Sequence, residues 1–298
     1  MPKRKGNPRV EALVARFGLD AVERRVVEIA YELERSLAAA DRMRKLGGLT
    51  IERLRAIVGD AVDAALSPRR ALRRHALVVV GAAMELSGMA AATDAVRLAP
   101  GLAARLDGAA EPDGLWLGCA RIAPGARGDL PARLAPVLTG LNGAVATLLT
   151  LDGCPRREAH ELAAGLARHS GRGVLVVDGE LLLDAPNPTL LLACARREAD
   201  CDGDALLVCE AGRLGERWRA LLAPATGTTA PLVVLADGER TRDPVAAAPF
   251  AVRRLSLHAA APTAAAAPPT ASEPRADDKA APIDDGLGHI RQQAIRDA

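Results

Sequence analysis

The stretch that most constrains the fold of this chain is residues 144–160, where a short apolar segment leads through a glycine turn into a helix-forming segment. The apolar part, residues 144–151, is rich in Ala, Val, Thr and Leu and is typical of a buried strand. The turn is Asp152-Gly153, and Pro155 stands where the first residues of a helix are expected. The order strand, glycine turn, helix predicts one unit of an α/β fold, with a helix N-terminus at which an anion can bind.

This turn lacks most of the side chains that a phosphate-binding loop needs. Such a loop reads Gly-x-x-x-x-Gly-Lys-Ser/Thr, in which backbone N–H groups and the lysine bind phosphates and the hydroxyl binds Mg²⁺. Here Gly153 is followed by Cys-Pro-Arg-Arg-Glu-Ala, without a second glycine, a lysine or a hydroxyl. We interpret Gly153 as a turn glycine with positive φ, or alternatively as part of a phosphate cradle. Arg156 and Arg157 are candidate anion-binding residues, or alternatively solvated residues of the first helical turn.

Short apolar strands and amphipathic helices alternate from residue 130 to about residue 257. The expected strands are residues 144–151, 173–177, 205–209, 232–236 and 252–257, and the expected helices are residues 130–141, 157–169, 188–199 and 213–222. Continuous apolar strands joined by helices are typical of a parallel, doubly wound sheet with both faces covered. A ligand is then expected at the carboxyl ends of the strands. Asp178 and Asp184, after the second of these strands, are interpreted as cap and loop residues.

The first part of the chain is mostly helical. Apolar residues recur at helical spacing over residues 10–37, and Gly18 divides this stretch into a short helix and a longer one capped by Asp20. Further elements are expected as helices at residues 50–58 (capped by Thr50), 60–66 and 101–106, and as strands at residues 72–80 and 95–98. Helices followed by a small β-hairpin predict a winged-helix-like module.

Composition narrows the classes of function. The net charge of +2 provides no general attraction to nucleic acid or to a membrane surface. No apolar run reaches the roughly 20 residues of a membrane-spanning helix, and the N-terminus lacks the apolar segment of a signal peptide, so we expect a cytoplasmic protein. The five cysteines form no Cys-x-x-Cys pair, which indicates reduced, mostly buried thiols and no zinc site.

Two blocks of sequence resemble a family of bacterial AAA+ ATPases that carry an N-terminal winged-helix domain. Residues 17–23, Phe-Gly-Leu-Asp-Ala-Val-Glu, followed by an apolar helix to Glu32-Leu33, are similar to the opening Phe-Gly-Leu-Ser-x-x-Glu segment of that family. Residues 67–78 and 96–100 resemble the hairpin of its winged helix. Some members are linked to contractile injection systems, which the resemblance permits as a context for this chain.

The resemblance and the composition together divide the chain into five parts. They are a basic tail (1–9), a winged-helix-like domain (10–107), a linker (108–129), a degenerate AAA+-like α/β domain of the P-loop NTPase type (130–258), and a disordered Ala/Pro-rich tail with a possible short C-terminal helix (259–298).

The resemblance assigns a role to few residues. Gly153 and Pro155 match the glycine and proline of the family's phosphate loop, and Arg156 or Arg157 falls near its lysine. The family's second motif has four apolar residues and then Asp-Glu, but here the apolar run is followed by Cys209-Glu210. Glu210 matches the catalytic glutamate that polarises the attacking water, whereas a cysteine is a poor ligand for Mg²⁺.

Two further features of the family are missing. The family's polar sensor, an Asn or Ser, would fall at residues 236–237, where this chain has Ala-Asp. The helical lid of the family is also not recognised after residue 257. The sequence therefore predicts a catalytically degenerate scaffold, adaptor or regulatory subunit without a cofactor, whose partner is another protein or an AAA+ homologue. The sequence does not decide whether the chain forms a homo-oligomer. Neither nucleic acid nor a membrane is expected as a partner.

Two other functions remain as alternatives. The first is a slow ATPase that uses ATP and Mg²⁺, with an arginine in place of the lysine and Glu210 as the base. The second is a DNA-binding regulator that uses the basic cluster of the hairpin region, Arg69, Arg70, Arg73, Arg74 and His75. Because no aromatic side chains accompany this cluster, we interpret it in the first place as a solvated basic edge or a surface for an acidic protein partner.

Overall fold

The computed structural model describes residues 7–45, 47–81, 84, 86, 88–108, 119–124, 145–154, 156–222, 230–238 and 250–256. The chain divides into two units, Met1–His258 and Ala259–Ala298, and all the described residues lie in the first. Pro155, the predicted helix at residues 130–141 and the predicted tail lie outside the described residues. Among the helices that are described, none combines the length and apolar character needed to cross a membrane.

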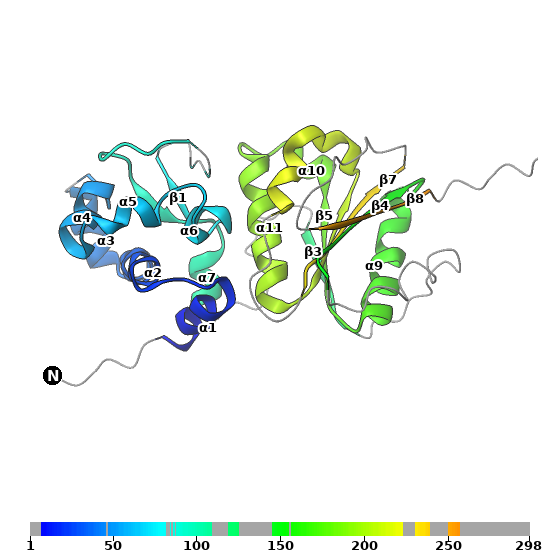
Figure 1. Ribbon diagram of the computed structural model, residues 1–298, viewed down its shortest axis with the longest axis horizontal. Helices are drawn as coiled ribbons and strands as arrows, with labels where there is room; N and C mark the ends of the chain where they lie inside the picture. Colours follow the sequence, from blue (N-terminus) through cyan, green and yellow to red (C-terminus); the bar gives the residue numbers. More distant parts are fainter. Residues whose placement is uncertain are drawn as a thin grey trace, which may run out of the picture. The chain divides into compact units, whose positions relative to one another are not determined.

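The N-terminal part consists of helices and one short hairpin (Figure 1). Its helices are α1 (Pro8–Phe17), α2 (Ala21–Arg35), α3 (Leu37–Lys45), α4 (Ile51–Val58), α5 (Ala61–Ala65), α6 (Ala71–Arg74) and α7 (Leu102–Asp107). The hairpin pairs β1 (Val78–Val80) with β2 (Val96–Leu98) in antiparallel orientation. Most of these elements match the predicted ones, because their apolar periodicity and their caps are local signals.

The predicted caps are confirmed. Gly18 ends α1 in the left-handed conformation at φ 62°, which a residue with a Cβ atom adopts only at a cost. Asp20 begins α2 with a capping box, in which its carboxylate accepts from the N–H groups of Val22 and Glu23 and the Glu23 side chain accepts from the Asp20 N–H. The hydroxyl of Thr50 accepts a hydrogen bond at the start of α4.

Two local predictions for this part need correction. Residues 72–80 were expected to form one strand, but residues 71–74 form α6 and only Val78–Val80 are extended. Ala, Leu and Arg are good helix formers, so the beginning of this stretch follows its helix propensity and only the Val-Val-Val run becomes a strand. Helix α3 was not expected.

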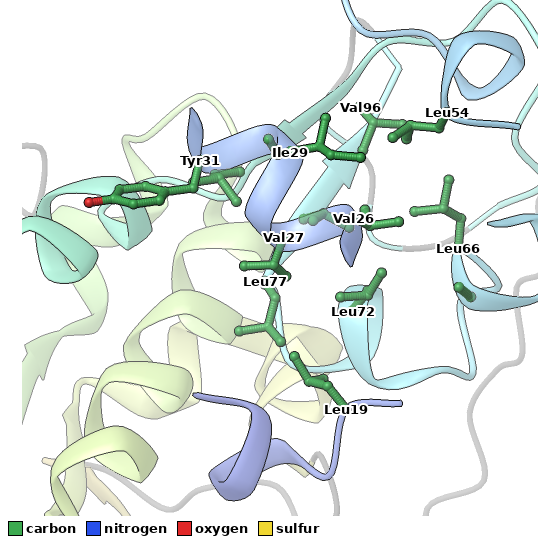
Figure 2. Packing of buried hydrophobic residues seen from close by; sticks show 14 of the residues in the cluster. Leu19, Val26, Val27, Ile29, Tyr31, Leu54, Leu66, Leu72, Leu77 and Val96 are labelled. Atoms are coloured by element: carbon green, nitrogen blue, oxygen red, sulfur yellow. The ribbon is translucent and has the colours of Figure 1, made fainter. Parts of the chain in front are cut away.

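The core of the N-terminal part is built mainly from aliphatic side chains, which come from α1, α2, α4, α5, α6, α7 and the hairpin. Val26, Val27, Leu54 and Leu72 are fully buried, and Figure 2 shows that they lie in one cluster with Leu77 and their neighbours. This packing places the hairpin against α2.

The second part is an α/β layer structure around a six-stranded, mostly parallel sheet (Figure 1). The strands are β3 (Cys119–Ile122), β4 (Thr147–Asp152), β5 (Val174–Asp178), β6 (Ala205–Cys209), β7 (Leu232–Asp237) and β8 (Ala251–Ser256), in the spatial order β3-β5-β6-β7-β4-β8. Strands β4 to β8 are parallel, as predicted. This architecture is compatible with a P-loop-like fold.

Strand β3 corrects the prediction of an all-parallel sheet. It pairs antiparallel with β5 at the edge, and its residues 119–122 were assigned to the predicted linker 108–129. Its four residues are only half-buried or exposed, so they lack the continuous apolar character of a central strand.

Helices cover both faces of the sheet. Helix α9 (Arg156–Ser170) packs on one face through Leu162, Ala163 and Leu166. The other face is covered by α10 (Gly179–Leu183), α11 (Pro188–Asp202) and η1 (Ala211–Leu222), a 3₁₀-type helix interrupted at Gly215 where a continuous helix was expected. Alternate strand residues point to the two layers, so both faces carry apolar side chains.

Candidate functional site

Three carboxylates and a thiol lie at the carboxyl ends of neighbouring strands. Asp152 ends β4 and is in register with Asp237 at the end of β7, and Asp178 ends β5 in register with Cys209 at the end of β6. All four residues are buried. This is the edge at which a parallel sheet presents its ligand site, and it is the edge that the sequence predicts.

Gly153 makes the turn from β4 towards α9. Its φ of 77° lies in the left-handed region, as the turn interpretation predicts. The next residue, Cys154, is 3% exposed, and its backbone N–H donates a 2.7 Å hydrogen bond to the carbonyl of Asp237. One N–H group of the turn is therefore already bound to the end of β7.

Arg156, the first residue of α9, is held by the protein's own carboxylates. Its guanidinium forms an ion pair with Asp178 and lies 3.6 Å from the carboxylate of Glu180. Glu180 also pairs with Arg213 at 2.7 Å. The predicted anion-binding arginine thus belongs to a network of two arginines and two acids. The side chain of Arg157 lies outside what the structure describes.

Asp178 also acts as a helix cap, as predicted. Its Oδ1 accepts hydrogen bonds from the backbone N–H groups of Glu180 and Leu181, at 3.0 Å and 3.2 Å, at the start of α10. The second oxygen, Oδ2, binds Arg156. Both oxygens of Asp178 therefore have partners in the protein. Asp184 is exposed at the end of α10, in agreement with its interpretation as a loop and cap residue.

Asp237 ties the start of η1 to the end of β7. Its carboxylate accepts from the backbone N–H of Gly212, and a Cβ atom at position 212 would lie 2.4 Å from that carboxylate. A larger residue at position 212 would therefore have to displace the Asp237 carboxylate. Asp152 and Asp237 make further interactions within the protein.

Cys209 and Glu210, at which the sequence resemblance predicts the acidic pair, follow one another at the end of β6. Cys209 is 3% exposed, and burial, followed by the nearby Cys154 and Asp178, raises the pKa of its thiol to about 12. The sulfur is therefore a neutral thiol near pH 7. Glu210 is half-buried and adopts a φ of 51°, a left-handed conformation that is uncommon for a residue with a Cβ atom.

The backbones of β5 and β6 come close at this point. A Cβ atom on Gly179 would lie 2.5 Å from the carbonyl oxygen of Cys209 and 3.1 Å from that of Glu210. The Glu210 carbonyl also accepts from the N–H of Arg213 at 3.2 Å. The unusual conformation of Glu210 thus turns the chain into η1 at a crowded strand end.

The predicted basic cluster of the hairpin region does not form one exposed patch. Arg70 pairs with Asp20 and Glu23 in the cap of α2, and Arg73 is buried and donates to the carbonyl of Gly88 at 2.9 Å. His75 is 3% exposed and packs on Phe17 with ring centroids 5.0 Å apart. Burial, followed by the charges of Arg74 and Arg196, lowers the pKa of His75 to about 3. The remaining members, Arg69 and Arg74, are exposed.

The part of the chain that the structure describes contains no group of three or more His, Cys, Asp or Glu side chains that could hold a metal ion.

No protein-family model matches the chain, and no curated protein matches it either. What the structure shows is an α/β protein with a six-stranded, mostly parallel sheet flanked by helices. Ion-paired carboxylates lie at the carboxyl edge of that sheet.

Proposed function

We propose that the chain is a P-loop-like protein that does not hydrolyse ATP and acts as a scaffold, adaptor or regulatory subunit. The observation that carries this proposal is that carboxylates of the protein itself contact the arginine at the predicted phosphate site. Arg156, the arginine closest to the position of the family's lysine, is paired with Asp178 and Glu180. A triphosphate would have to displace these carboxylates to reach the guanidinium.

The carboxylates at the strand ends support the same conclusion. Asp178 is paired with Arg156, and Asp152 and Asp237 also interact within the protein, so a phosphate at this edge would have to displace existing contacts. A working phosphate loop offers lysine and free N–H groups instead.

The position of the metal-ordering aspartate holds a neutral thiol. Mg²⁺ prefers hard oxygen ligands, and the Cys209 thiol, with its pKa raised to about 12, supplies neither an oxygen nor a negative charge. This supports a protein that does not hydrolyse ATP.

A slow ATPase is the second candidate, and one observation favours it. Glu210 stands at a strand end in a left-handed conformation, and strained residues of this kind concentrate at functional sites. In that case Glu210 would polarise a water molecule while Arg156 or Arg157 contacted the phosphates.

Phosphate release from Mg·ATP distinguishes the two candidates. The wild-type chain, the Glu210→Gln variant and the Glu216→Gln variant are compared, because Glu216 is an exposed glutamate in η1 with 82% of its side chain accessible. We expect all three to match the protein-free blank. Turnover that is lost in Glu210→Gln and retained in Glu216→Gln would overturn the proposal and establish the second candidate.

A further inference from the structure

A cleft of about 580 Å³ lies between α6, the first half of α11 and η1. This volume falls within the range of about 300–1,000 Å³ that is typical of ligand pockets. The apolar residues that line the cleft come from four segments: Pro68, Leu86, Ala193, Ala220 and Leu222. The cleft shares no residue with the carboxyl edge of the sheet.

The polar lining of the cleft is strongly basic. Among the residues that the structure describes, it contains four arginines, Arg73, Arg74, Arg217 and Arg219, against the one carboxylate of Glu216, so these described side chains carry three more positive than negative charges. Arg219 pairs with Glu216 at 3.3 Å, and both of these side chains are more than half exposed.

Two of these arginines have no acidic partner among the described residues. Arg74 and Arg217 are exposed, and neither forms an ion pair with any other residue that the structure describes. Thr189, in the first turn of the 15-residue helix α11, also lines the cleft. The positive end of the helix dipole adds to the attraction for a negative ligand at this point.

We propose that this cleft binds an acidic, partly apolar peptide segment of a protein partner. Guanidinium groups form paired hydrogen bonds with carboxylates, so Arg74 and Arg217 would hold the acidic side chains. The apolar wall would bury the aliphatic side chains that lie between them. A peptide in the cleft contacts both the N-terminal helices and the α/β part, because the lining residues come from both.

The lining favours a peptide over nucleic acid. Among the described residues, none of the side chains that line the cleft is aromatic, so these residues offer bases no surface on which to stack. The concave apolar wall suits aliphatic side chains, whereas a phosphate backbone requires an extended polar surface. The overall net charge of +2 also provides little general attraction to nucleic acid.

The inference rests on the proposed function, because it names the class of partner that such a scaffold would bind. The cleft and the carboxyl edge of the sheet consist of different residues, however, so the two proposals can be refuted separately. Phosphate release tests the carboxyl edge alone, and peptide binding tests the cleft alone.

The test is a fluorescence-anisotropy titration of the full chain with a labelled peptide, Asp-Glu-Leu-Asp-Glu-Ile-Asp-Glu. Two further probes are the amide peptide Asn-Gln-Leu-Asn-Gln-Ile-Asn-Gln and a single-stranded DNA 12-mer. The variant is Arg74→Glu with Arg217→Glu, and the matched control is Arg42→Glu with Arg97→Glu, which changes the net charge equally at exposed arginines elsewhere. Circular dichroism establishes that both variants are folded.

We expect saturable binding of the acidic peptide and much weaker binding of the amide peptide. The double variant Arg74→Glu with Arg217→Glu should bind the acidic peptide about tenfold or more weakly than wild type, whereas the control variant should bind it nearly as well as wild type. An equal loss in the control variant would overturn the proposal, because binding would then follow net charge alone. No binding of the acidic peptide, or DNA binding that is tighter than peptide binding and is lost in the cleft variant, would overturn it too.

Discussion

Replacing Arg197 by methionine tests how α11 is joined to the N-terminal part. The Arg197 side chain is fully buried, and its guanidinium donates to the carbonyl oxygens of Ala76 at 2.6 Å and Pro100 at 2.7 Å. It also donates to the Glu198 carboxylate at 3.0 Å and 2.8 Å. These bonds connect one helix of the α/β part to the two ends of the hairpin region.

The magnitude follows from the groups that the substitution leaves behind. Methionine fills much of the space of the arginine stem but donates no hydrogen bond, so two backbone carbonyls lose their donor at this site. Glu198 retains its ion pair with Arg105 at 2.8 Å. Breaking a buried ion pair costs about 3–5 kcal/mol, and each buried acceptor left unpaired costs about 1–3 kcal/mol. Because Glu198 keeps Arg105 as its partner, the two unpaired carbonyls set the cost, and we expect Arg197→Met to lower the free energy of unfolding by about 2–6 kcal/mol.

Urea denaturation followed by circular dichroism measures this change. The control is Arg25→Met, because 49% of the Arg25 side chain is exposed and its pair with Glu28 lies on the helix surface. That variant is expected to change the free energy of unfolding by less than about 1 kcal/mol. If the two variants differ by less than about 1 kcal/mol, Arg197 does not join the two parts as described.

Three further predictions concern the local structure. Gly179→Ala would place a Cβ atom 2.5 Å from the Cys209 carbonyl, so urea denaturation should show a loss of about 1–3 kcal/mol, and an unchanged midpoint would contradict the close approach. Asp20→Ala should cost about 1 kcal/mol because it removes a capping box, whereas Asp60→Ala, at a helix start without a side-chain cap, should cost little; equal effects would contradict the capping role. His75 has a pKa lowered from 6.5 to about 3, so the unfolded chain alone takes up its proton between these values, and stability falls as the pH falls through this window by up to about 1.4 kcal/mol per unit. His75→Phe should remove this contribution, and denaturation profiles that stay parallel to wild type between pH 6 and pH 5 would refute it.

The central strands could be predicted from the sequence because they are buried on both faces. Strand β6 has the predicted bounds, 205–209, and β4, β5 and β7 differ from theirs by a few residues at most. The edge strand β8 also lies within a residue of its predicted bounds. Strand β3 could not be recognised, since its four residues pair at the sheet edge and are not fully buried. Its position depends on tertiary pairing with β5, which carries no local signal.

The position of the candidate site residues at the strand ends could be predicted from the sequence, but the ion pairs between their side chains could not. The positive φ of Gly153 and the cap at Asp178 follow from local sequence. The ion pair between Arg156 and Asp178 does not, because it joins residues that only the packing of α9 and β5 brings together. The burial of Arg197 could not be predicted either, because the sequence shows an ordinary charged helical residue, and its bonds to Ala76 and Pro100 form only in the folded chain.

Calorimetric titration of the full chain with ATP in the presence of Mg²⁺ tests the central claim most directly. The claim is that the predicted phosphate site is already occupied by the chain's own carboxylates, through Arg156 paired with Asp178 and Glu180. We expect no saturable binding of ATP up to millimolar concentrations. Saturable binding that is weakened by Arg156→Met would contradict the account.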